Sequence, residues 1–410
     1  MTTAFKIVGS DHGAQRDLAL EAFGYTFDDA ADVALTLAPE APTFCYSAEI
    51  VQSRARTFLA KFPGKVAYAV KANSDPDVVL TVAACGIDVF DVASVEEMAL
   101  VRSLVPGARL HYHNPVKSRS EIAKAYRLYG CRRFAADHAD EIDKIAAVVG
   151  NAPGTEIAVR FRLTTNGDSA HDFSSKFGAT PEEASGLLRQ VVAANFVPIL
   201  TFHPGSQCLK PSAYARHIRQ AAQIAADAGV TLAALNVGGG FPARYLASDV
   251  PPLEDYFRAI DDAADEAFGP HRLSGRPALE CEPGRGLVAP AISLLTRVKL
   301  VKQERREAYI NDGVYGALME VNQAPSLLPR YRVIRDGATV TGPTAPFVLY
   351  GPTCDPIDRF PVALELPLDI AEDDYIEFDT LGAYGSATAT RFNGYHSRET
   401  VLVRRIFDGL

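Results

Sequence analysis

The sequence predicts an α/β protein of two domains, a (β/α)₈ TIM barrel followed by a mostly antiparallel β-barrel or β-sandwich domain. At 410 residues the chain exceeds one ordinary core, but it suits a barrel of about 250 residues plus a smaller domain. Strand-like and helical patterns alternate over residues 42–286, and strand-like runs alone follow. We therefore expect a barrel at 42–286 and a β domain at 287–410, to which residues 1–41 contribute.

The barrel region contains short β-branched or aromatic runs, each ended by a polar break. The predicted strands are Lys65–Val70, Ile87–Val92, Arg109–His113, Arg133–Ala136, Glu156–Leu163, Pro198–His203, Leu232–Val237 and Ala278–Glu282. Amphipathic helical patterns, several opened by Ser, Asp or Pro, are Ser47–Lys61, Val95–Leu104, Ser118–Leu128, Glu141–Val149, Pro181–Ala194, Ser212–Ala228 and Leu253–Ala267. Catalytic groups of such a barrel gather at the carboxyl ends of its strands.

After residue 286 the strand-like runs have no helices between them, which is typical of an antiparallel β domain. They are Ile292–Val301, Glu307–Ile310, Tyr331–Ile334, Phe347–Tyr350 and Tyr375–Phe378.

Composition narrows the class of function. The net charge is −9 and the basic residues are dispersed, so we expect no nucleic-acid or membrane partner and a small-molecule substrate instead. The six cysteines form no CxxC pair, which argues against a zinc site or a disulfide framework, and we expect no metal. The amino end has no signal-peptide pattern and no stretch has the length of a membrane span, so we expect a cytoplasmic protein.

Lys71 and Glu282 each close a predicted barrel strand. Burial lowers the pKa of an amine and makes it a better nucleophile toward an aldehyde, so Lys71 is a candidate for a Schiff base. A carboxylate such as Glu282 can keep a pyridine nitrogen protonated. A lysine that reaches solvent and a surface pair between Glu282 and Arg285 are the structural alternatives.

Two further strand ends carry glycine-rich or polar turns. Gly238-Gly239-Gly240 allows backbone N–H groups to approach a phosphate, although a tight turn alone explains it equally well. The segment from His203 to Ser206 offers an imidazole for stacking on a flat ring and a hydroxyl for a phosphate, or a merely hydrogen-bonded histidine. In the second domain Cys354 stands beside Asp355 in a Gly/Pro turn.

Taken in order, YAVKAN, GGGFP, EPGRG, NDGVYG, GPTCD and GAY followed by FNG resemble the alanine-racemase-type (fold type III) decarboxylases that use pyridoxal 5'-phosphate (PLP). The resemblance covers residues 42–407 and is to the ornithine/lysine decarboxylase branch. It implies a PLP-dependent decarboxylase of a basic or diamino acid that releases CO₂ and a diamine. It also implies a head-to-tail homodimer with shared active sites, and polyamine biosynthesis or a specialised pathway as the setting.

The resemblance also assigns roles to positions of this sequence. Lys71 carries the cofactor, Glu282 meets its ring nitrogen and His203 stacks on the ring. Phosphate contacts fall to Ser206, Gly240, Arg285 and Tyr384, and Gly239 and Gly284 also line the cofactor site. Asp91 and Glu97 support the lysine, and Arg160, or its neighbour Arg162, faces the phenolic oxygen. Cys354 is the proton donor to Cα, and the substrate pocket includes Asp355, Tyr315, Glu320 and Phe392.

Departures from the branch leave the substrate open. A second acid is usual about ten residues after the GVYG turn, but this chain has residues 321–325, VNQAP, there and only Glu320 nearby. Pro204 follows His203 in place of an aliphatic residue. Two alternatives concern the substrate: the enzyme could decarboxylate a substituted diamino acid of specialised metabolism, or diaminopimelate. Two concern the function: an amino-acid racemase, or a catalytically silent protein that binds a partner.

Overall fold

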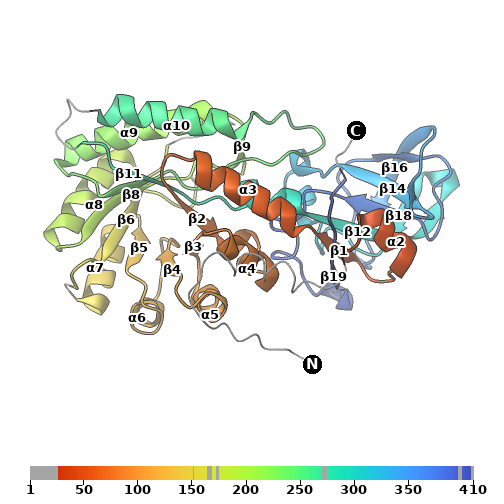
Figure 1. Ribbon diagram of the computed structural model, residues 1–410, viewed down its shortest axis with the longest axis horizontal. Coiled ribbons are helices and arrows are strands. Elements are labelled where there is room, and N and C mark those ends of the chain that lie inside the picture. Colours follow the sequence, from red (N-terminus) through yellow and green to blue (C-terminus); the bar gives the residue numbers. More distant parts are fainter. Residues whose placement is uncertain are drawn as a thin grey trace.

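Eight parallel strands close into a barrel, which lies beside a second, sheet-based domain (Figure 1). The computed structural model describes residues 26–150, 152–163, 169–171, 175–269, 275–395 and 399–407. Around the barrel the strands are β2 (Lys65–Ala69), β3 (Val89–Val92), β4 (Arg109–Tyr112), β5 (Arg133–Ala136), β6 (Glu156–Arg160), β8 (Val197–Thr201), β10 (Ala234–Asn236) and β11 (Ala278–Cys281). Each falls within a predicted strand or overlaps it, and the predicted barrel is confirmed.

Helices surround this barrel. They are α3 (Ala48–Lys61), α4 (Pro76–Ala84), α5 (Val95–Leu104), α6 (Arg119–Arg127), α7 (Ala139–Val149), α8 (Pro181–Ala193), α9 (Pro211–Ala228), α10 (Leu253–Phe268) and the short α11 (Arg285–Val288). All but α4 and α11 overlap a predicted helical pattern. Reciprocal capping by Ser118 and Glu121 fixes the start of α6. Thr180 and Glu183 do the same for α8, with Pro181 in its first turn.

The second domain is a nine-stranded, mostly antiparallel sheet, as predicted. Its members are β1 (Thr43–Tyr46), β12 (Ile292–Lys302), β13 (Glu307–Ile310), β14 (Tyr331–Arg335), β15 (Ala338–Thr339), β16 (Thr344–Tyr350), β17 (Leu364–Pro367), β18 (Tyr375–Phe378) and β19 (Glu399–Leu402). Two of its pairings, β13 with β16 and β1 with β19, are parallel.

The first described elements of the chain, α2 (Ala30–Leu37) and β1, belong to the second domain, and the barrel elements follow them. Strand β1 lies inside the range expected for the barrel, but it pairs with β12 and β19. Helix α2, capped by Asp29, packs its alanines and Val33 on the same sheet. The first barrel element is therefore α3, and red and blue segments lie side by side in Figure 1.

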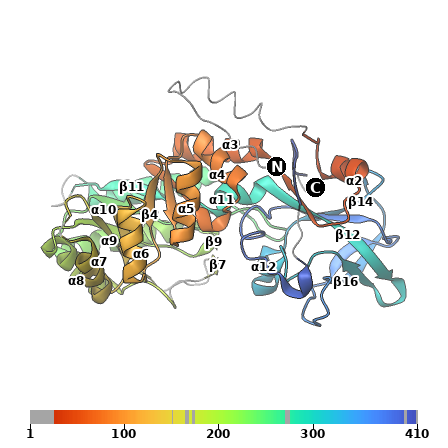
Figure 2. The ribbon, with the colours of Figure 1, turned by 90° about the horizontal axis from the view of Figure 1, so that it is seen from below.

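A short antiparallel pair, β7 (Ser169–His171) and β9 (Ser206–Cys208), lies on the side of the barrel that faces the second domain (Figure 2). The sequence had suggested a turn here. Within the described residues, none of the helices combines the length and apolar content that a membrane span needs.

Candidate active site

Lys71 stands at the barrel mouth, in a single 3₁₀ turn, Val70–Ala72, that ends β2. Its Nζ lies 2.8 Å from Oδ2 of Asp91, which comes from the neighbouring strand β3. The Lys71 side chain is 43 % exposed, whereas that of Asp91 is buried. The amine is therefore anchored by a buried carboxylate and still open to a ligand.

The pKa of Lys71 is raised, whereas the sequence predicts that burial lowers it. Burial lowers the pKa of its ammonium, but Asp91, Tyr384 and Glu282 together outweigh that effect and the net pKa is raised. The expected lowering of this pKa is therefore wrong for the cofactor-free chain. Its amine becomes a nucleophile only by giving up a proton.

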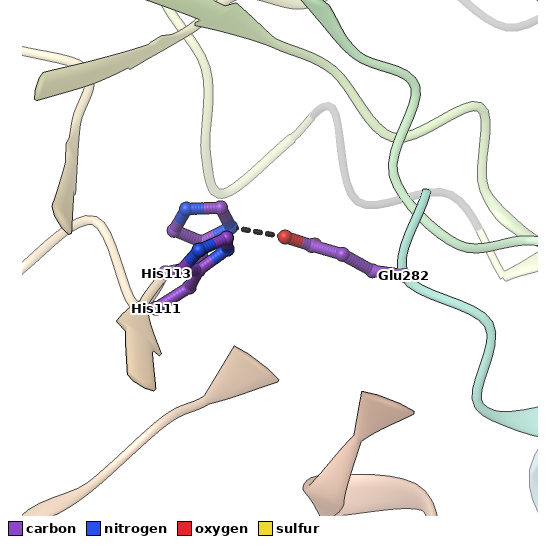
Figure 3. A group of neighbouring side chains, drawn as sticks. All are labelled: His111, His113 and Glu282. Carbon is purple, nitrogen blue, oxygen red and sulfur yellow. Dashed lines mark ion pairs between the residues drawn. The ribbon is translucent and has the colours of Figure 1, made fainter. Parts of the chain in front are cut away.

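Glu282 follows β11 and is buried in the same mouth. Asn236 Nδ2 donates a hydrogen bond of 2.6 Å to its Oε1, and His113 Nδ1 contacts the same oxygen (Figure 3). Burial raises the pKa of Glu282, but His113 and Lys71 more than reverse this, so the pKa is lowered and the group is a carboxylate. Lys71 and Glu282 each shift the pKa of the other, which shows that the two charged groups lie near each other at the barrel mouth.

The glycine turn after β10 has no room for side chains. A Cβ on Gly239 would lie 2.8 Å from the carbonyl oxygen of Glu282 and 3.1 Å from Nε2 of His203. Gly240, at φ +93°, would place its Cβ 2.5 Å from the Gly205 carbonyl oxygen. Gly284 packs as closely on Ala72. The turn thus brings bare backbone to the place where a flat ring and a phosphate are expected.

His203 lies against this turn. Its Nδ1 accepts a hydrogen bond of 3.1 Å from the Gly205 N–H. Burial lowers its pKa well below the usual value, and Arg160 and Lys71 lower it further. The ring is therefore neutral and suited to stacking on a cationic pyridine.

Arg285 joins the residues expected at the phosphate. Its Nε donates to Ser206 Oγ at 3.2 Å, and its guanidinium lies 4.9 Å from the ring centre of Tyr384. The other edge of the guanidinium binds Glu320 through hydrogen bonds of 2.6 and 2.9 Å and also contacts Tyr245. Glu320, expected in the substrate pocket, lies in α12 (Met319–Gln323) and is held by Arg285.

Two supporting residues are now better defined. Arg160 is half-buried, and Asp137, Glu282 and Asp91 act on its pKa, whereas Arg162 is exposed. Of the two arginines, Arg160 is therefore the better candidate to face the phenolic oxygen of the cofactor. Glu97 Oε2 accepts the Ala93 N–H at 2.7 Å, so it closes the start of α5 and contacts neither Lys71 nor Glu282 directly.

The predicted proton donor lies in a different place, on the second domain. Cys354 is exposed, and its Sγ and backbone N–H lie 3.3 and 3.2 Å from Asn393 Oδ1. Asp355 Oδ2 accepts the Tyr315 hydroxyl at 2.7 Å, and the Tyr315 ring packs 4.7 Å from that of Phe392. Among the described residues, no hydrogen bond or ion pair joins this cluster to Lys71 or Glu282.

The residues present fit a phosphorylated pyridine aldehyde. One carboxylate, one neutral imidazole, one amine and a glycine cradle flanked by Arg285 and Ser206 match its ring nitrogen, ring face, aldehyde and phosphate. The site also includes His113, Asn236 and Tyr245, which sequence reasoning missed. Polar residues at the ends of the strands that yield His113 and Asn236 were the available signal.

Comparisons with known proteins agree with this chemistry. Residues 48–289 match the family model described as pyridoxal-dependent decarboxylase, pyridoxal binding domain. The chain is 33 % identical to a lysine/ornithine decarboxylase of Selenomonas ruminantium, over 82 % of this chain and 83 % of that protein. It is 31 % identical to ornithine decarboxylase of Mus musculus, over 80 % and 73 %. The structure of lysine/ornithine decarboxylase from Vibrio vulnificus complexed with cadaverine is similar, with a TM-score of 0.78, 29 % identity and 92 % and 97 % coverage.

Proposed function

This chain belongs to the pyridoxal-dependent decarboxylases, and from that premise we propose that it removes the α-carboxylate of a basic or diamino acid, of the size of ornithine or lysine. The observation that carries the proposal is the meeting of the Lys71 amine and the Glu282 carboxylate in one barrel mouth. The protein is a PLP-dependent enzyme, as its family is. When bound, the PLP ring accepts the electron pair released at Cα.

The chain's own residues hold and charge this site. Lys71 supplies the amine for the aldehyde, and Asp91 is placed to take up or return its proton across 2.8 Å. Glu282, a carboxylate, would meet the ring nitrogen, and the neutral His203 would cover one face of the ring. Arg285 and Ser206 would bind the phosphate together with the glycine turn.

We further propose that Cys354 returns the proton to Cα in the active site of a second copy of the chain. The support is the exposed thiol, held in a cluster that makes no described polar contact with the barrel site of its own chain. A thiol is largely protonated at neutral pH and can serve as the donor. A head-to-tail homodimer follows, in which each site needs both subunits.

The distal end of the substrate is assigned to Asp355. Its neighbour Ile357 N–H and the Tyr315 hydroxyl keep its pKa low, so it offers a carboxylate to a cationic group. Glu320 is bound to Arg285 and is not counted as a second acid for that group. The Vibrio vulnificus relative is complexed with cadaverine and, in another structure, with putrescine, which supports a diamine product.

Release of CO₂ from a panel of amino acids tests the proposal. The panel is L-ornithine, L-lysine, L-arginine, L-2,4-diaminobutyrate and meso-diaminopimelate, each with PLP present. We expect L-ornithine or L-lysine to be the best substrate. Preference for diaminopimelate would overturn the substrate class, and inversion of a substrate without loss of CO₂ would overturn the reaction.

A further inference from the structure

His113 is a second buried partner of Glu282 that the cofactor assignments do not use. It follows β4, across the barrel mouth from Glu282 (Figure 3), and its side chain is only 6 % exposed. Its Nδ1 contacts Oε1 of Glu282, and it is the largest influence that lowers the Glu282 pKa.

Both described partners of the Glu282 carboxylate lie on the same oxygen. Asn236 Nδ2 reaches Oε1 at 2.6 Å, and His113 Nδ1 contacts Oε1 as well. Two donors on Oε1 fix the rotation of the carboxylate. They leave Oε2 as the oxygen that can accept a hydrogen bond from a ring nitrogen.

The two ring nitrogens of His113 indicate where its proton lies. Among the described residues, both are buried and neither makes a hydrogen bond of regular geometry, but Nδ1 contacts Oε1 of Glu282. An unprotonated Nδ1 would oppose its lone pair to the carboxylate, and a proton on Nε2 alone would be a buried, unsatisfied donor, so Nδ1 carries a proton. That proton faces Oε1 and orients the carboxylate.

His111, His113 and Glu282 together have the residue types of a metal site. One possible ligand atom from each lies within 4.8 Å of the others. Positive charge already surrounds them, because Arg133 Nη1 is 3.4 Å from His111 Nδ1 and the raised pKa of Lys71 keeps its ammonium charged. Glu282 is also required by the ring nitrogen. Orientation of Glu282 is therefore the better supported role.

We propose that His113 is a positioning residue for the cofactor: its Nδ1 contacts Oε1 of Glu282 and so directs Oε2 at the pyridine nitrogen. The proposal rests on the proposed role of Glu282. It adds His113 to the residues that recognise the pyridine nitrogen of the cofactor.

The test compares PLP with a carbocyclic analogue that has a C–H in place of the ring nitrogen. Full-length protein freed of cofactor is titrated with each compound, and the ratio of the two dissociation constants is measured. We expect wild type to prefer PLP and His113→Leu, which lacks the donor, to lose about tenfold of that preference. His113→Asn places an amide N–H near the position of Nδ1 and should retain most of it. His138→Gln removes an exposed imidazole at the start of α7 and should leave the ratio unchanged.

Equal loss of affinity for both compounds in His113→Leu would mean that His113 only supports the fold and would overturn the proposal. An unchanged ratio in that variant would also overturn it. If wild type itself does not distinguish the two compounds, the role of Glu282 fails and this proposal fails with it. Should His113→Leu not fold, His113→Ala against His113→Asn makes the same comparison.

Discussion

At the scale of single residues, the neighbours of Lys71 decide its charge more than its burial does. Asp91 and Glu282 are both carboxylates of the same mouth, and Tyr384 adds to their effect. The family resemblance placed these three residues at the cofactor site, but it did not predict their combined effect on the charge of Lys71, from which they are separated by 20, 211 and 313 positions. The strand end identified the lysine, and the fold shows which charged groups lie close enough to raise its pKa.

Lys71→Ala should lose nearly all CO₂ release and the visible absorbance of bound PLP, because the variant has no amine at the barrel mouth for the aldehyde. Lys65→Ala is the matched control, since Lys65 begins the same strand and is exposed. It should behave as wild type. Full activity of Lys71→Ala would show that Lys71 is not the residue that carries the cofactor.

Lys117 provides a pH-dependent prediction. Its Nζ donates to the carbonyl oxygens of Ala135 and Asn114 at 2.6 and 2.8 Å and pairs with Glu141 at 3.0 Å. Burial lowers its pKa to about 8, from about 10.5 in the unfolded chain. Between these values the folded protein binds fewer protons than the unfolded one, so this residue makes the free energy of unfolding rise with pH, by up to about 3 kcal/mol.

Lys117→Met removes that contribution. The wild type should therefore gain stability over the variant as the pH rises from about 8 to about 10. Chemical denaturation at each pH measures the difference. Lys124→Met, at an exposed position of α6, should differ from wild type by a constant amount. If the free energies of unfolding of wild type and Lys117→Met differed by the same amount at every pH, the pKa of Lys117 would not be lowered.

At the scale of elements, β-branched runs predicted every barrel strand because each is buried on both faces and bounded by a polar turn. The pair β7 and β9 escaped because three residues are too few to display an alternation. Strand β1 was not predicted for a related reason: it has only four residues, all of them buried, and nothing in them indicates a partner. Only its long-range pairing with β12 and β19 shows that it belongs to the second domain.

Gly240 tests the cradle formed by the turn after β10. Gly240→Ala forces a Cβ to within 2.5 Å of the Gly205 carbonyl oxygen at a φ of +93°, so the turn must shift. We expect PLP affinity to fall by about 5- to 150-fold, for a strain of about 1–3 kcal/mol. Titration of PLP into the cofactor-free protein measures it.

Gly186→Ala is the control for this substitution. Gly186 lies in α8, and a Cβ added to it would meet nothing within 4 Å. Alanine there should raise stability by about 0.5–1 kcal/mol without changing PLP affinity. Unchanged affinity in Gly240→Ala would remove the turn from the cofactor site.

At the scale of the whole molecule, the separation of the exposed Cys354 cluster from the Lys71 site predicts that activity is shared between subunits. Lys71→Ala and Cys354→Ala, each inactive alone, should regain up to about a quarter of wild-type sites when mixed and allowed to exchange, by random pairing. CO₂ release after mixing measures the recovery. Either variant mixed with itself is the control, and no recovery would mean that one chain builds a complete site.

Strand β1 sets the order in which the molecule can be completed during synthesis. Its partner β12 begins at residue 292, roughly 250 residues after β1 ends at residue 46. All eight barrel strands lie between them, so the ribosome has delivered the whole barrel before β1 can pair. At that stage β1 is an unpaired edge awaiting its neighbours, and slow translation of the residues after 292 would prolong its exposure to other nascent chains.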